Sequence, residues 1–477
     1  MYRNNFNKTK IIATIGPATS SYENLKSIIQ AGVDVCRLNF SHGSHEVHRE
    51  VLNTVRKINK ELKSNVCLLQ DLQGPKLRIG KVQGDSMELI QGAELLVTSQ
   101  ECLSTAEKLY VSYENLGRDT RPGERILMDD GKIELSIIEV LDDVHVRVRV
   151  MQGGMLSSNK GFNLPESHLT VPCLTEKDIA DLEFGLTLDV EWIALSFVRK
   201  PEDIIELKER IAAAGKRTRV IAKIEKPEGV ANIDDIIKVT DGIMVARGDL
   251  GVEVPLQKVP LIQKSIVEKC IAAGKPVIIA TQMMESMITN SMPTRAEITD
   301  VANAVLDGAD AVMLSAETSV GKFPIRVVEV MERIIGDVEA DRRVYYKGQR
   351  PTPSSPSFIS DEVCFTAVRM SDHLKAKAIV AMTKSGYTGF KVASYRPEAE
   401  IFIFTDNEPL LNTLSLVWGV RGFYYNKFAS TDETFNDVLN FLKDAGYVRE
   451  GDCVINCASM PIHLKQRTNA IKVSIVN

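Results

Sequence analysis

The 477-residue sequence lacks several features that would restrict where a protein acts and on what. No apolar run reaches the roughly 20 residues that a membrane-spanning helix needs. The polar stretch from Met1 to Lys10 precedes an apolar segment too short for a secretory signal. The net charge of −5 gives no basic excess of the kind that nucleic-acid binders use. We therefore expect a cytoplasmic protein with no membrane partner and no nucleic-acid partner.

Cysteine is also sparse, with eight residues scattered along the chain. This is not the dense framework of a small secreted scaffold, and it favours a reducing compartment. Cys453 and Cys457 are four residues apart in an apolar run, where buried thiols are a simpler interpretation than a metal site. The remaining composition, 44% hydrophobic and 25% charged, is that of a globular protein. The length predicts about three domains.

Strand and helix patterns alternate between residues 9 and 317. Short β-branched runs precede segments with helical periodicity, several of which end at a glycine. We expect strands at Lys10–Ile15, Asp34–Phe40, Val66–Leu72, Glu191–Phe197, Arg219–Glu225, Gly242–Asp249, Pro276–Thr281 and Ala311–Glu317. Eight such units predict a (β/α)₈ TIM barrel made of residues 1–74 and 172–342, although an open doubly wound sheet could show the same alternation.

Residues 75–171 interrupt this alternation with a β pattern. Residues 144–150 alternate with period two, and Asp130-Gly131 between two apolar runs indicates a hairpin. Turn residues at both ends are suited to hinges. We expect an inserted β-barrel-like domain that acts as a movable cap over the strand ends, with a fixed β decoration as the alternative.

A third domain, residues 343–477, begins with a linker at 349–356 that contains three prolines. Strands are expected at Ala378–Met382, Glu400–Phe404 and Cys453–Asn456, and helices at Glu362–Leu374 and Asp432–Ala445. The pattern predicts a small α/β domain.

Charged side chains follow the expected barrel strands at the end where such barrels place their catalytic groups. Lys223 and Glu225 are two apart on one strand and so point to the same face. Glu225 and Asp249, on adjacent strands, can share a hard divalent cation such as Mg²⁺. A salt bridge of Lys223 with either acid is the simpler alternative. Further charges expected at the same mouth disfavour it: Arg37, Asp71, Arg247 and Glu317.

The turn at residues 248–251 can present free backbone N–H groups to an anion. With Arg37, Lys223 and a bridging cation, it predicts a small substrate that carries phosphate and carboxylate. Phosphoryl transfer requires the positioning and charge neutralisation that such a site provides. The sequence contains no Walker motif and no kinase-type glycine loop that would indicate another phosphate scaffold.

Five segments are distinctive in combination: Arg37–Gly43, Ile221–Glu225, Met244–Glu253, Thr281–Met287 and Met313–Thr318. They closely resemble the signature segments of the pyruvate kinase family, and the likeness covers nearly the whole chain. The resemblance implies transfer of the phosphoryl group of phosphoenolpyruvate to ADP, giving pyruvate and ATP in glycolysis. It also implies Mg²⁺ or Mn²⁺ as the cofactor.

The same resemblance gives each site residue a role. Lys223 would stabilise charge on the phosphoryl group and the enolate oxygen, and Arg37 would bind the phosphoryl group. Glu225 and Asp249 would hold the metal. The substrate carboxylate would contact the amides of Gly248 and Asp249 and the side chain of Thr281, which would also assist proton delivery through water. The nucleotide phosphates would face Asn39, Ser41, His42, Arg78 and Lys160.

Lys76 departs from the common pattern of the family. Many members need a monovalent cation, held by residues that match Asn39, Ser41, Asp71 and the carbonyl of Leu72, with a glutamate where this chain has Lys76. The sequence resembles the potassium-independent branch, because an ammonium there can supply the positive charge itself. We expect activity without added potassium. The alternative is a solvated lysine without this role.

The segment 383–389 resembles the family's effector phosphate loop. A sugar-phosphate effector would contact Thr383, Lys384, Ser385, Gly386 and Thr388 through hydroxyls and backbone amides. The partner loop, residues 459–467, does not match the glycine-rich segment of sugar-bisphosphate-activated members, so a domain used only for assembly is the alternative. A homotetramer under allosteric control is implied by the resemblance alone.

Two other functions stay open on the sequence. Another metal-dependent enolate enzyme, such as a pyruvate or oxaloacetate lyase, would share Lys223, Glu225 and Asp249 but would not need the cap, Arg78 or Lys160. A non-catalytic metabolite sensor would not need the intact charged site.

Overall fold

The computed structural model describes residues 6–427, 430–460 and 467–477. Within these residues, eight strands form a closed parallel barrel in the order β1-β16-β15-β14-β13-β12-β3-β2. The barrel strands are β1 (Lys10–Thr14), β2 (Val35–Asn39), β3 (Cys67–Asp71), β12 (Trp192–Leu195), β13 (Arg219–Ile224), β14 (Gly242–Ala246), β15 (Val277–Ala280) and β16 (Ala311–Leu314). The prediction of a TIM barrel is confirmed, and the doubly wound alternative is wrong.

Helices surround the barrel, and local sequence signals set several of their ends. Thr175 and Thr294 form capping boxes at the starts of α4 and α10, and Gly274 and Gly308 end α9 and α10 in the left-handed conformation. The surrounding helices are α1 (Tyr22–Ala31), α2 (His45–Leu62), α4 (Glu176–Thr187), α5 (Pro201–Ala213), α6 (Pro227–Ala231), α7 (Ile233–Val239), α9 (Val259–Ala273), α10 (Arg295–Asp307), α11 (Ala316–Ser319) and α12 (Pro324–Glu339).

The barrel interior is packed at one end and charged at the other. Ile12, Trp192, Ile221 and Met244 belong to one buried apolar cluster inside the strands. Along β13, Ile221 and Lys223 share the inward face, while Val220, Ala222 and Ile224 belong to the core between the strands and the outer helices. Side-chain alternation along β13 therefore places Lys223 on the inward face near the carboxyl end of the barrel, next to the buried apolar cluster.

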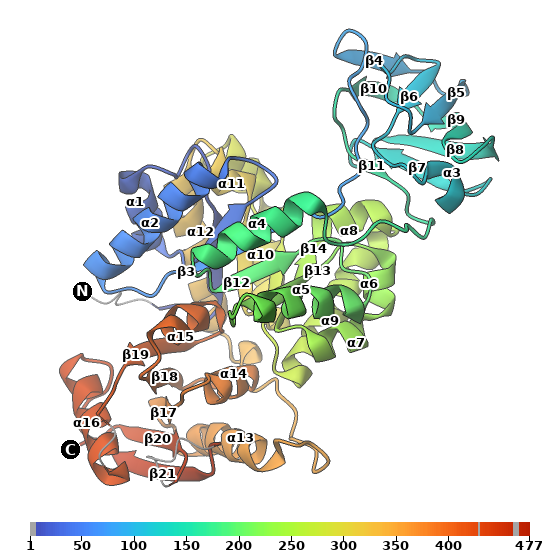
Figure 1. Cartoon of the computed structure of the whole chain (residues 1–477). Helices are drawn as coiled ribbons and strands as arrows, with labels where there is room; N and C mark the ends of the chain where they lie inside the picture. The colour runs from blue at the N-terminus through green and yellow to red at the C-terminus, as the bar shows by residue number, and fades with distance from the viewer. Residues whose placement is uncertain (1–5, 428–429, 461–466) are drawn as a thin grey trace.

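The inserted domain is built from two sheets with a buried core of their own. A six-stranded sheet has the order β11-β7-β8-β9-β5-β6, and β10 pairs with β4; every residue from 75 to 171 is described. In Figure 1 this domain stands away from the barrel on two connecting segments. Its elements are β4 (Ser86–Leu89), β5 (Glu94–Thr98), β6 (Lys108–Tyr110), α3 (Leu116–Asp119), β7 (Arg125–Met128), β8 (Ile133–Val140), β9 (His145–Gln152), β10 (Gly154–Ser157) and β11 (Phe162–Asn163).

The C-terminal domain packs against the opposite side of the barrel from the cap (Figure 1). Its described residues form a five-stranded sheet in the order β19-β18-β17-β20-β21, in which only β21 runs antiparallel. The elements are α13 (Phe358–His373), β17 (Ala378–Met382), α14 (Tyr387–Ser394), β18 (Glu400–Thr405), α15 (Glu408–Thr413), β19 (Val420–Tyr424), α16 (Thr431–Asp444), β20 (Cys453–Ala458) and β21 (Ala470–Ile475).

All eight cysteines lie in the described ranges and carry free thiols. None of the helices in the described part of the chain combines the length and the apolar character that crossing a membrane requires.

Candidate active site

Four charged side chains meet at the carboxyl ends of β2, β3 and β13. The Lys223 ammonium lies 3.2 Å from Asp71 Oδ1 and 3.1 Å from Glu225 Oε1. Arg37 Nε donates to Asp71 Oδ2 at 2.7 Å, and all four residues are buried. The ion pair that the sequence left open as an alternative is therefore present with Glu225, and Lys223 also pairs with Asp71. Asp71 links the lysine and the arginine into one network.

The charges in this network hold one another in definite ionisation states. Burial lowers the pKa of Lys223, but the negative charges of Asp71 and Glu225 outweigh it, so that its pKa is raised above the usual value. Burial raises the pKa of Asp71, yet Lys223 and Arg37 outweigh this and lower it overall. Lys223 is therefore an ammonium and Asp71 a carboxylate at neutral pH.

Glu225 carries an excess of negative potential. Its pKa is raised by burial and further by the nearby charge of Asp249, against the opposing effect of Lys223. The described residues contain no group of three or more His, Cys, Asp or Glu side chains that could hold a metal. Mg²⁺ commonly uses only one or two carboxylates together with substrate oxygens and water. Glu225 and Asp249 therefore fit such a cation as donors.

The segment after β14 is a helix and not the open turn expected from its glycines. α8 (Arg247–Glu253) begins directly after the strand. The Gly248 N–H donates to Thr281 Oγ1 at 2.7 Å, and Asp249 Oδ1 lies 3.4 Å from Lys76 Nζ. The connection between β14 and α9 is short, and α8 fills most of it with helical backbone.

Two further charges expected at the mouth follow β14 and β16, and each is engaged with groups next to it. Arg247 pairs with Asp300 at 2.7 Å and donates to the carbonyl of Thr281 at 2.8 Å. Glu317 is buried and accepts from the backbone N–H groups of Ser315 and Met284. Burial raises the pKa of Glu317. Both side chains hold backbone in place.

Residues with positive φ angles follow the ends of two barrel strands. Phe197, after β12, has φ 57°, and Thr281 and Gln282, after β15, have φ 68° and 55°. A positive φ is unfavourable for a bulky or β-branched residue and is common at functional sites. Ser196, which sequence reasoning did not select, accepts a hydrogen bond from Lys223 at 2.6 Å. Its position at the end of an expected barrel strand was the available signal.

The residues assigned to the nucleotide lie in two domains. Asn39, Ser41 and His42 follow β2 on the barrel, where Asn39 Oδ1 accepts from the Ser41 N–H at 3.1 Å. Arg78 and Lys160 lie on neighbouring segments of the cap, and the Lys160 ammonium pairs with Asp129 at 2.7 Å. The two groups therefore belong to the two domains that Figure 1 shows joined by connecting segments.

The groups matched to a monovalent cation site already have partners. Asp71 contacts Arg37 and Lys223, and the Leu72 carbonyl accepts from the Ser196 hydroxyl at 2.7 Å. The Lys76 ammonium lies beside the Asp249 carboxylate.

Four residues of the expected effector loop line a cavity of about 920 Å³: Thr383, Lys384, Ser385 and Thr388. Arg217 and Arg219 from the barrel and Arg467 from the C-terminal domain line it too. Within the loop, Thr383 Oγ1 accepts from the Gly386 N–H at 3.0 Å, and the Thr388 hydroxyl contacts Thr468. Residues 461–466 of the partner loop lie outside the described residues.

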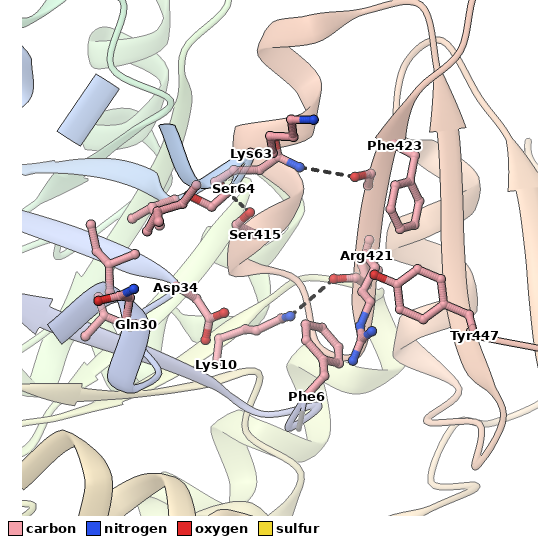
Figure 2. A pocket seen from close by; sticks show the side chains of 17 residues that line it. Phe6, Lys10, Gln30, Asp34, Lys63, Ser64, Ser415, Arg421, Phe423 and Tyr447 are labelled. Carbon is pink, nitrogen blue, oxygen red and sulfur yellow. Dashed lines mark hydrogen bonds between the residues drawn. The ribbon is translucent and has the colours of Figure 1, made fainter. Parts of the chain in front are cut away.

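A separate cavity of about 330 Å³ lies between the barrel and the C-terminal domain (Figure 2). It is lined by Lys10 and Asp34 at the amino ends of β1 and β2 and by Arg421 on β19. Lys10 Nζ donates to the carbonyl of Val420 at 3.2 Å. None of the residues predicted for the reaction lines it.

A TIM barrel with a buried lysine and carboxylates at its mouth, an inserted cap and a terminal α/β domain defines a phosphotransferase class. The family model for the pyruvate kinase barrel domain matches residues 6–328, and that for the pyruvate kinase alpha/beta domain matches residues 361–474. The chain belongs to the pyruvate kinase family.

Individual proteins to which the chain is similar are also pyruvate kinases. The chain is 45% identical to pyruvate kinase 2 of Synechocystis sp., over 98% of this chain and 79% of that protein. It is 40% identical to pyruvate kinase of Clostridium acetobutylicum, over 98% and 99% of the two chains. A crystal structure of a pyruvate kinase from Cryptosporidium parvum superposes with a TM-score of 0.92 at 34% identity, covering 99% of this chain and 96% of that one.

Proposed function

We propose that the chain transfers the phosphoryl group of phosphoenolpyruvate to ADP, giving pyruvate and ATP as a step of glycolysis. The observation that carries this proposal is the Lys223 ammonium, buried between Asp71 and Glu225 at 3.2 and 3.1 Å. Such a charge, fixed before substrate binds, stabilises anions without reorganisation at the moment of reaction. Membership of the pyruvate kinase family supports the same reaction.

Lys223 and Arg37 supply positive charge where the reaction moves negative charge. The bond between phosphorus and the enol oxygen breaks, and a bond forms between phosphorus and the terminal phosphate oxygen of ADP. Arg37 holds the phosphoryl group and Lys223 neutralises the charge left on the enolate oxygen. The enolate carbon then takes a proton from a water that Thr281 Oγ1 orients. The amides of Gly248 and Asp249 and the Thr281 side chain would hold the carboxylate, which would take the place of Thr281 Oγ1 as the acceptor of the Gly248 N–H.

Glu225 and Asp249 would hold a divalent cation, Mg²⁺ or Mn²⁺. When bound, it would neutralise charge on the substrate oxygens. Burial raises the pKa of Glu225, and the nearby charge of Asp249 raises it further; a cation held by both carboxylates would relieve the second effect, which supports this assignment.

The cap would complete the nucleotide site. Asn39, Ser41 and His42 on the barrel and Arg78 and Lys160 on the cap would together face the phosphates of ADP. Their division between two domains supports cap closure over the bound substrates. Closure would exclude water and so protect the phosphoryl group from hydrolysis.

Activity would not need potassium. The position of the Lys76 ammonium, 3.4 Å from a carboxylate of the site, supports this proposal. It supplies a permanent positive charge next to the reacting phosphate, so that the residues matched to a potassium site, Asn39, Ser41, Asp71 and Leu72, need not bind an ion.

The C-terminal domain would bind a sugar phosphate, and the chain would act as an allosteric homotetramer in the cytoplasm. The cavity at Thr383, Lys384, Ser385 and Thr388 and the arginines beside it support an anionic effector, which would also face the backbone of Gly386. Large apolar side chains exposed on both domains support assembly. They are Leu256, Leu261, Met292 and Val320 on the barrel and Ile359, Val473 and Ile475 on the C-terminal domain.

A coupled assay tests the proposal. Purified protein is given phosphoenolpyruvate, ADP and Mg²⁺, and pyruvate is measured with and without potassium and with a panel of sugar phosphates. ADP-dependent pyruvate formation is expected. Lyase activity on oxaloacetate without ADP would favour the enolate enzyme, and ligand binding without turnover would favour the sensor. Either result in place of ADP-dependent turnover would overturn the proposal.

A further inference from the structure

We propose that Ser196 is a positioning residue that aims the Lys223 ammonium at the reacting phosphate; this inference rests on the proposed function. Ser196 follows the last residue of β12, which lies between β3 and β13 in the barrel. Its hydroxyl accepts from Lys223 Nζ at 2.6 Å and donates to the Leu72 carbonyl at 2.7 Å. The residue therefore connects the strands that carry Asp71 and Lys223.

Ser196 makes the shortest of the three polar contacts of the Lys223 ammonium. The others are ion pairs of 3.1 and 3.2 Å to Glu225 and Asp71. An ammonium has three donors, so these acceptors fix its direction. The two carboxylates partly neutralise the positive charge of the Lys223 ammonium. A neutral hydroxyl fixes the position of the nitrogen without neutralising that charge. Ser196 can therefore position the ammonium and leave its charge to act on the substrate.

The hydroxyl is itself held rigidly. Ser196 is 1% exposed, and Cys173 Sγ donates to its carbonyl at 3.2 Å. The next residue, Phe197, is in the left-handed region with φ 57°, and its N–H donates to Glu225 Oε2 at 2.7 Å. A β-carbon on Gly74 would lie 3.0 Å from Ser196 Cβ, so neighbouring backbone closes the remaining space. Contacts from both sides therefore restrain the turn at 196–197.

Removal of this acceptor would leave Lys223 between two acids. The ammonium would move toward Asp71 and Glu225 and away from the direction of the substrate. A displacement of about 1 Å in a catalytic group can lower turnover about a hundredfold. Because the lost interaction acts in the transition state, kcat would fall while the KM for phosphoenolpyruvate stayed nearly constant.

The test compares two variants of the full-length protein with a matched control. Ser196→Ala removes the hydroxyl, and Ser196→Cys keeps the size but offers only a weak sulfur acceptor. We expect kcat to fall about tenfold to a hundredfold in both variants. The KM for phosphoenolpyruvate and the affinity for Mn²⁺, measured by calorimetry, should stay within about threefold. Thr240→Val removes a buried hydroxyl at the amino end of the barrel and should leave kcat unchanged.

Three outcomes would overturn the inference. Turnover of Ser196→Ala within twofold of the parent would show that the hydroxyl is not needed. A Cys variant as active as the parent, beside a slow Ala variant, would indicate packing in place of positioning. A parallel loss of kcat, KM and Mn²⁺ affinity would indicate general damage to the site. A parent protein without ADP-dependent turnover would instead refute the proposed function.

Discussion

Lys76→Glu should convert the protein into a potassium-dependent enzyme. Opposite unit charges at the 3.4 Å that separates Lys76 from Asp249 attract by about 5 kcal/mol at an effective dielectric constant of about 20. The two side chains are 35% and 33% exposed, so screening reduces the net contribution of the pair to stability to about 1 kcal/mol or less. The substitution should therefore leave the fold intact.

The effect on activity should be larger than the effect on stability. The substitution changes the charge beside the reacting phosphate by two units, and a loss of about 2 kcal/mol in transition-state stabilisation lowers the rate about thirtyfold. The glutamate would also restore a ligand beside the groups of Asn39, Ser41 and Asp71. Added potassium should then recover most of the lost turnover, because the ion replaces the missing positive charge.

The assay is the coupled reaction in tetramethylammonium chloride, with potassium chloride substituted at constant ionic strength. The turnover of the unsubstituted protein should be the same in both salts, whereas the turnover of Lys76→Glu should rise at least tenfold in potassium chloride. Lys76→Gln is the control, since it removes the ammonium without adding a carboxylate and should be slow with or without potassium. A parent that strictly requires potassium, or a glutamate variant that ignores it, would refute the reasoning.

Two further predictions concern the carboxylates of the site. Glu225→Gln should raise the Mn²⁺ concentration at half-saturation at least tenfold, since Mg²⁺ and Mn²⁺ prefer charged oxygen donors; calorimetric titration checks this, and unchanged affinity would remove Glu225 from the metal site. Asp71→Asn should destabilise the protein by about 3–5 kcal/mol at pH 7, because it removes the buried negative charge with which both Lys223 and Arg37 pair. The folded-state pKa of Asp71 is lowered, so its contribution is present above the unfolded pKa of about 3.9 and is lost as the pH falls through the folded value. Urea unfolding should therefore show a smaller difference at pH 3.5 than at pH 7, and a constant difference would contradict the pairing.

The barrel could be predicted from the sequence because its signals are local. Runs such as Arg219–Glu225 combine β-branched residues with a polar end, and glycines such as Gly274 and Gly308 mark helix ends. Side-chain alternation along β13 also placed Lys223 and Glu225 on one face, and the structure brings them within 3.1 Å of each other.

The elements that were not predicted depend on tertiary context. β21 is a half-exposed edge strand with mixed polarity. Its antiparallel pairing with β20 cannot be predicted from any local sequence pattern. α8 is a single short helix at a position that its glycines mark as a turn. Glycine lowers helix propensity, and the packing of the segment after β14 overrides that preference.

The same limit applies to the site. Arg247 has the sequence position of a mouth residue, but its side chain reaches Asp300 on α10, which lies 53 residues further along the chain. Ser196 was passed over for the opposite reason. A serine after a strand is common, and only its contacts with Lys223 and the Leu72 carbonyl distinguish it. Such assignments require the partners of a side chain, which one sequence does not contain.

The most direct measurement of the central claim is the turnover and substrate binding of Lys223→Met. The account predicts that phosphoryl transfer from phosphoenolpyruvate to ADP falls about a thousandfold, because the charge aimed at the enolate and phosphoryl oxygens is gone. Calorimetry should still detect phosphoenolpyruvate binding in the presence of Mg²⁺. Turnover of this variant within tenfold of the parent would contradict the role given to the buried ammonium.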